Sequence, residues 1–206
     1  MKSRNLFVAP VLGAALMIFG GSAFAQDAVS QSGSASAQKS DHSSSSSSQV
    51  SAKDKAFMMK AAKGGMQEVE LGQMVADKAQ SDDVKQFAKR MVDDHSKAND
   101  ELKALAQQKG VTLPTDSGAE GKEMKAKLEK LSGAQLDKAY MHHMVLDHTK
   151  DVHEFQTESK MAKDSDVKSF AEKTLPTLQD HLKQAKDVAA KTSAATTKKS
   201  SETASQ

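Results

Sequence analysis

Apolar side chains recur at intervals of three and four residues from about residue 53 to about residue 191. The series Val84, Phe87, Ala88 and Met91 is typical of this stretch. Such spacing places the apolar positions on one face of an α-helix, whereas a half-buried strand would need alternation. β-branched residues are scattered and aromatic residues make up only 4% of the chain, so strands are not favoured. We therefore expect an all-α domain over residues 53–191.

Turn and cap signals divide this domain into four long helices. Ser81, Ser132 and Asp164 each precede a periodic stretch and can accept hydrogen bonds from free backbone N–H groups at a helix start. Gly110 and Pro114 end the second helix. We expect a first helix over about 53–79, a second ending at 109, a third from the Ser132 cap to about 161, and a fourth after the Asp164 cap. A short charged helix is expected at about 120–130.

Two blocks of sequence repeat at a constant offset. Residues 83–88 read Asp-Val-Lys-Gln-Phe-Ala, and residues 166–171 read Asp-Val-Lys-Ser-Phe-Ala. Because the blocks open the second and fourth long helices, the repeat predicts two related helical hairpins joined by a crossover. Ferritin-like bundles are built in this way. The expected fold is a ferritin-like four-helix bundle with a short crossover helix, flanked by disordered tails.

The first 25 residues have the three parts of a secretory signal peptide. Lys2 and Arg4 give a basic start, an apolar run covers 6–19, and Ala23-Phe24-Ala25 offers a cleavage pattern before Gln26. The apolar run is short for a membrane span, and a retained N-terminal anchor helix is the alternative. We expect export to the periplasm, with association at the outer membrane left open.

The segments that flank the domain are poor in apolar residues. Residues 26–52 contain an unbroken serine run at 43–48, and residues 192–206 have a similar composition. With little to bury, both are expected to be disordered. No cysteine occurs in the chain, so neither a lipoprotein anchor nor a disulfide is expected. No transmembrane segment is expected once the signal is removed.

The charge balance argues against a nucleic-acid partner. The whole chain has 29 basic and 27 acidic side chains, and the signal segment contains two of the basic ones and no acidic one. The mature chain is therefore formally neutral. A phosphate-binding surface would need an excess of lysine and arginine.

Four polar residues interrupt the apolar stripes of the four long helices. They are Glu68, His95, His148 and His181, and each has small or apolar neighbours three or four residues away. Each should therefore point inward, and each lies near the midpoint of its own helix. In a bundle of similar-length helices, the four side chains would meet at one level of the core. Unpaired, they would be costly to bury.

Two hypotheses explain how this layer is satisfied. In the first, His95, His148 and His181 bind one transition metal ion, with Glu68 as fourth ligand or supporting group. Zinc, iron, nickel and copper all accept such ligands. In the second, the four residues form a hydrogen-bonded cluster with water, since burial alone demands no metal. Met91 and Met144, one turn before two of the histidines, would suit copper(I) but are also ordinary core residues.

Aspartate precedes each of the three histidines, at Asp94, Asp147 and Asp180. Adjacent residues on a helix diverge by roughly 100°, so these aspartates are expected to face solvent rather than orient their own neighbours. His142, His143 and His153 are expected on outer or flanking faces.

Several blocks resemble a known family. They are 64–72 (Gly-Gly-Met-Gln-Glu-Val-Glu-Leu-Gly), 87–99 with its Asp93-Asp94-His95, 139–148 with its Asp147-His148, and Thr174-Leu175-Pro176-Thr177-Leu178 followed by His181. In this order they closely resemble exported bacterial proteins catalogued as domain of unknown function 4142, over about 53–188. The resemblance implies a ferritin-like fold and a periplasmic or outer-membrane location. It implies no established activity.

The chain departs from the wider ferritin-like group at the metal ligands. That group binds two irons through Glu-x-x-His pairs. Here Val92, Val145 and Leu178 stand three residues before the three histidines, and none of them is a ligand. A ferroxidase, a di-iron oxygenase or an iron store is therefore not expected.

These observations leave three functional hypotheses. The first is a non-enzymatic periplasmic protein that binds one metal ion at Glu68, His95, His148 and His181. The alternative is a structural or interaction protein of the cell envelope, acting under stress and binding an envelope partner, with a purely structural polar layer. An enzyme ranks third, because the sequence has no nucleophile elbow, phosphate loop or paired-carboxylate signature.

Overall fold

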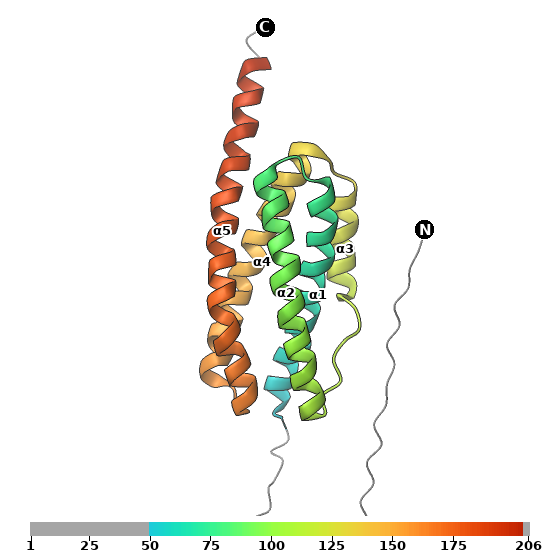
Figure 1. The fold of residues 1–206 in the computed structure, drawn as a ribbon, viewed down its shortest axis with the longest axis vertical. Helices are drawn as coiled ribbons and strands as arrows, with labels where there is room; N and C mark the ends of the chain where they lie inside the picture. The colour runs from blue at the N-terminus through green and yellow to red at the C-terminus, as the bar shows by residue number, and fades with distance from the viewer. Residues whose placement is uncertain (1–49, 204–206) are drawn as a thin grey trace, which may run out of the picture. The chain divides into compact units, whose positions relative to one another are not determined.

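The computed structural model describes residues 50–203, which fall within one unit of the chain, Ser45–Gln206. The expected signal peptide and most of the Ser-rich linker lie outside the described residues. All regular elements in residues 50–203 are helices (Figure 1). They are α1 (Ala52–Lys78), α2 (Asp82–Lys109), α3 (Gly118–Glu129), α4 (Gly133–Met161) and α5 (Ser165–Thr203).

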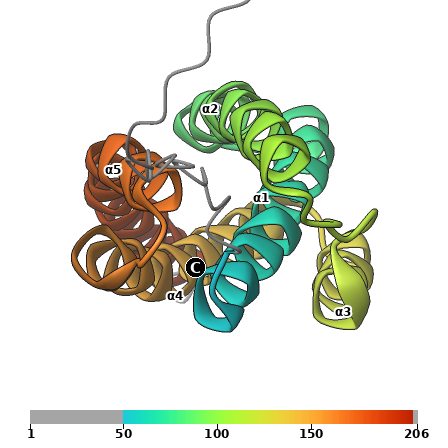
Figure 2. The ribbon, with the colours of Figure 1, turned by 90° about the horizontal axis from the view of Figure 1, so that it is seen from below.

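Four of these helices form a bundle. α1 packs along α2 and α4 packs along α5, while α2 with α5 and α1 with α4 join the two hairpins into a ring (Figure 2). α3 lies outside this ring against α1 and α4. The predicted ferritin-like four-helix bundle with a short crossover helix is confirmed. None of the described helices has an apolar stretch long enough to cross a membrane.

The two hairpins brace each other through equivalent aspartates. Asp137, near the start of α4, accepts hydrogen bonds from the backbone N–H groups of Gln80 and Ser81 in the α1–α2 turn, at 3.0 and 2.8 Å. Asp54, near the start of α1, accepts from Lys163 and Asp164 in the α4–α5 turn. The two aspartates are separated by the same offset as the repeated sequence blocks. The repeat therefore extends from the sequence to the tertiary contacts.

The apolar core consists of two clusters, with the polar residues between them. Phe87, Tyr140 and Met144 belong to one cluster, and Met58, Leu102 and Phe170 belong to the other. On every long helix of the bundle, the polar residue of the predicted layer falls between the stretches that contribute to the two clusters. All four polar residues are buried: Glu68, His95, His148 and His181. The layer thus lies where the core changes from one cluster to the other.

Two details differ from the sequence predictions. α5 continues through Pro176 and ends at Thr203, whereas the sequence predicts a disordered tail from 192. No glycine or further proline follows Pro176, so nothing in the sequence stops the helix once it has formed. Ser81 and Ser132 stand at the N-caps of α2 and α4 as predicted, but neither side chain makes a capping hydrogen bond to any described residue.

Candidate metal centre

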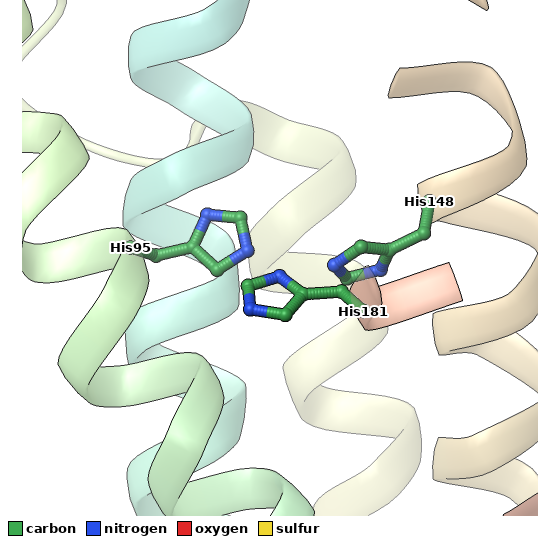
Figure 3. A group of neighbouring side chains, drawn as sticks. All are labelled: His95, His148 and His181. Carbon is green, nitrogen blue, oxygen red and sulfur yellow. The ribbon is translucent and has the colours of Figure 1, made fainter. Parts of the chain in front are cut away.

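Three histidines from three helices meet inside the bundle. His95 comes from α2, His148 from α4 and His181 from α5, and their rings converge (Figure 3). One ring nitrogen of each lies within 4.8 Å of those of the other two. The ring centroids are 5.6 Å apart for His95 and His148, 5.4 Å for His95 and His181, and 5.3 Å for His148 and His181. We refer to these residues as the histidine triad.

A backbone hydrogen bond orients the His148 ring. Its Nδ1 lies 3.0 Å from the carbonyl oxygen of Met144, one turn earlier on α4. A carbonyl oxygen only accepts, so Nδ1 carries the proton and donates it. The neutral ring then has its lone pair on Nε2, which is buried and has no hydrogen-bond partner among the described residues. Met144 thereby leaves Nε2 of His148 as an acceptor.

A carboxylate orients the His181 ring in the same manner. Its Nε2 donates to Oδ2 of Asp94 on α2 at 2.9 Å. Arg90 donates from Nε to the same oxygen at 3.2 Å. Arg90 also donates from Nη1 to Gln184, so the guanidinium that binds the carboxylate is itself held in place. This leaves Nδ1 of His181 with the lone pair, again buried and without a partner in residues 50–203. A carboxylate behind a ligating histidine is the usual arrangement at protein metal sites.

His95 completes the triad and borders a small cavity. Its Nε2 is a third buried nitrogen for which the described residues provide no partner. A cavity of about 30 Å³ adjoins it, and Asp151, Glu154 and Lys60 also line this cavity. That volume is enough for about one water molecule. Because Lys60 is exposed, the cavity links the buried triad to residues at the surface.

Burial keeps the triad neutral and ready to bind a metal. Removal from water lowers the pKa of His95 well below its usual value, and the neighbouring His148 and His181 lower it further. Burial, together with His181, lowers the pKa of His148 to about 4. Burial also lowers the pKa of His181, although Asp94 opposes this. Metal ions bind neutral imidazole, so no proton competes for the three nitrogens at neutral pH.

Glu68, the fourth residue of the predicted layer, belongs to a neighbouring group. One of its oxygens lies within 4.8 Å of ligand atoms of His143 and Asp147, both on α4. The Glu68 side chain is fully buried, and neither of its oxygens has a hydrogen-bond partner in the described part of the chain. Gln67 donates to Nε2 of His143 at 2.9 Å. We call Glu68, His143 and Asp147 the carboxylate group.

The acids around this group hold protons more tightly than usual. Burial raises the pKa of Glu68 well above its usual value, and the carboxyl groups of Asp147 and Asp151 raise it further. Burial, with Asp147 and Glu154, raises the pKa of Asp151 to about 8. The pKa of Tyr140 is raised by its own burial and by Glu68. Burial therefore favours the protonated form of Glu68.

The structure corrects the expectation for the aspartates and for His143. Asp180 is exposed as expected, but Asp94 and Asp147 are partly buried and contact residues of other helices. His142 and His153 are exposed as expected, whereas His143 is half-buried. A residue one step from an inward position points about 100° away, which in a bundle is toward the adjacent helix. The Asp-His pair that occurs on three of the long helices was the sequence signal available for these contacts.

Residues 39–188 match the family model described as "Domain of unknown function (DUF4142)". This chain belongs to the DUF4142 family. No curated protein matches the sequence significantly.

Solved structures with the same fold come from two groups. A DUF305 fragment from Deinococcus radiodurans is 15% identical with a TM-score of 0.60, over 69% of this chain and 98% of that one. A DUF305 protein from Streptomyces coelicolor is 16% identical with a TM-score of 0.59, over 68% and 93% of the two chains. CopM in its Cu(II)-bound form is 15% identical with a TM-score of 0.54, over 67% and 96%. At these identities, the likeness concerns the fold.

Proposed function

We propose that this DUF4142 protein is an exported, non-enzymatic metal-binding protein that holds one transition metal ion at His95, His148 and His181. Export rests on the signal-peptide pattern of residues 1–25, which predicts a periplasmic location. The metal rests on one observation, namely that three buried ring nitrogens, all without a hydrogen-bond partner in residues 50–203, converge from three helices.

The arrangement of the triad fits a metal better than a structural cluster. In a hydrogen-bonded cluster, the three nitrogens would find donors, yet Nε2 of His148 and Nδ1 of His181 are both acceptors, and Nε2 of His95 could donate to one of them at most. Two of the rings also have their second nitrogen tied to Met144 and Asp94, so they cannot turn to donate to each other without losing those bonds. At least one of these acceptors would then stay buried and unpaired, at a cost of about 1–3 kcal/mol. A metal ion satisfies all three at once.

Copper is the first metal to test, with zinc and iron after it. CopM, which shares this fold, has been crystallised in Cu(II)-bound and Ag-bound forms. Imidazole binds copper, zinc and iron, and divalent copper binds most tightly of the first-row series. The bound ion would be held rather than used in a reaction, because the triad is buried and the cavity that borders His95 is small. Sequestration or delivery of a metal ion is the function that this geometry supports best.

The test is metal content and affinity of the mature protein purified from the periplasm without chelators. We expect a near-stoichiometric metal by mass spectrometry, and titration of the stripped protein with Cu²⁺ and Ag⁺ to give one tight site. His95→Ala and His181→Ala should each weaken this site by more than about 100-fold, since each removes a ligand. His153→Ala is the matched control, because His153 is an exposed histidine on α4.

Equal affinities in the wild type and the triad variants would contradict the proposal. The layer would then serve to fix the register of the helices. In that case a partner of the cell envelope, captured through the helical surface, would become the better explanation of the function.

A further inference from the structure

The carboxylate group lies between α1 and α4, apart from the histidine triad. α1 contributes Glu68, and α4 contributes His143 and Asp147 four residues apart on one face. The triad takes its ligands from α2, α4 and α5 instead. The two sets therefore share α4, on which Asp147 and His148 are consecutive, but they share no residue.

An ionised Glu68 would need a positive partner that the described residues do not supply. Its side chain is fully buried, and both oxygens are without hydrogen-bond donors within residues 50–203. The Asp147 carboxyl that faces it is another acceptor. Two carboxyl groups can face each other in a buried place only if a proton or a metal cation lies between them. The half-buried His143 adds an imidazole, which is a common metal ligand, beside the two acids.

We propose that Glu68, His143 and Asp147 form a second cation site, selective for a divalent ion that accepts oxygen ligands, such as Mn²⁺ or Zn²⁺. Two carboxylates and one imidazole suit these ions better than the soft Cu⁺ or Ag⁺. Asp151 is a third acidic group beside the site, one turn further along α4. Nε2 of His143 accepts a hydrogen bond from Gln67, and a cation bound at this nitrogen would replace that bond.

The two sites differ in chemistry. The triad offers only nitrogen, and the carboxylate group offers mainly oxygen. Mn²⁺ is the weakest binder of the first-row series at nitrogen sites, so it should report on the carboxylate group with little interference from the triad. Ag⁺ is the opposite probe and should report on the triad.

The experiment titrates the metal-stripped mature protein with Mn²⁺, followed by electron paramagnetic resonance of the free ion. We expect one Mn²⁺ site in the wild type and in His181→Ala, which lacks a triad ligand. Glu68→Gln and Asp147→Asn should each weaken Mn²⁺ binding by at least about tenfold, while Ag⁺ binding stays within about threefold of the wild type. Asp77→Asn, an exposed acid on α1, is the matched control for charge and should bind Mn²⁺ as the wild type does.

The outcomes separate this site from the proposed function. Mn²⁺ binding that survives His181→Ala and is lost in Glu68→Gln supports the second site even if the triad binds nothing. Failure of the wild type to bind either Mn²⁺ or Zn²⁺ outside the triad, or equal binding by the wild type and Glu68→Gln, overturns it and assigns a shared proton to Glu68 and Asp147. Glu68→Gln preserves the side-chain volume and removes a buried acid, and circular dichroism would verify its fold.

Discussion

Nε2 of His181 on α5 donates to Oδ2 of Asp94 on α2 at 2.9 Å, and this contact links the two hairpins beside the histidine triad. Asp94 is next to His95 in the sequence, so α2 contributes a ligand and, one residue earlier, the group that orients a ligand on another helix. Arg90 donates from Nε to the same carboxylate oxygen at 3.2 Å. The support around His181 is therefore as well defined as the triad itself.

Loss of the Asp94 carboxylate should weaken metal binding without removing a ligand. We expect Asp94→Ala to lower the affinity of the triad for Cu²⁺ or Zn²⁺ by about 10- to 100-fold, because His181 loses both its orientation and its charged partner. Isothermal titration of the stripped protein measures this. Asp93→Ala, at the exposed neighbouring position, should bind as the wild type does. An unchanged affinity in Asp94→Ala would mean that His181 is not a ligand.

Acid should destabilise the metal-free protein through His148. The pKa of native His148 is about 4 because the ring is buried, against 6.5 for the ordinary side chain. Between these values the unfolded chain binds more protons than the native one, so stability is present above about pH 6.5 and is lost as the pH falls toward 4. The contribution of this one group is on the order of 3 kcal/mol.

His148→Leu should remove this contribution. Urea unfolding of the stripped protein at pH 7.5 and pH 4.5 measures it, and the variant should lose less stability on acidification than the wild type. His153→Ala, which alters an exposed histidine, should retain the wild-type pH dependence. Parallel acid profiles for the wild type and His148→Leu would contradict the burial of a neutral ring.

Asp151 should act in the opposite direction, at alkaline pH. Burial together with Asp147 and Glu154 raises its pKa from 3.8 to about 8, while Lys60 and Lys150 partly offset this. Between these values the native protein binds more protons than the unfolded chain, so the contribution is present at low pH and is lost as the pH rises toward 8. Asp151→Asn should therefore stabilise the metal-free protein at pH 8.5 by roughly 2 kcal/mol, with a gain that shrinks toward pH 4. Thermal unfolding across this pH range measures the gain, and Asp180→Asn, which alters an exposed aspartate, is the control.

The sequence was sufficient to predict which residues face the core, because this depends only on the apolar spacing within one helix. The spacing of three and four residues that identifies Leu102 as core also identifies His95 as inward-facing, and both are buried. The level of the polar layer followed from helix lengths alone, and the two apolar clusters on either side of it agree with that prediction.

Contacts between helices could not be predicted in the same way. Whether Asp94 meets solvent or His181 depends on how far α2 is rotated about its axis and how closely α5 approaches it. The rotation of α1 similarly places Glu68 with His143 and Asp147. A rotation of the helix by a few tens of degrees separates these alternatives, and this is within the usual spread of helix packing. The rotation cannot be derived from the apolar pattern of a single sequence.

The close approach of α1 and α2 can be tested at two glycines of α1. A Cβ added at Gly72 would lie 2.9 Å from the carbonyl oxygen of Ala88 and 2.9 Å from Cγ2 of Val92, so Gly72→Ala must push the two helices apart. We expect it to destabilise the protein by about 1–3 kcal/mol. At Gly64, no described atom lies within 4 Å of the added Cβ, so Gly64→Ala should stabilise the helix by about 0.5–1 kcal/mol. Urea unfolding of the two variants measures both effects. Because the chemical change is the same, opposite signs would place α1 against α2 at Gly72, and two stabilising substitutions would show that the helices are further apart than described.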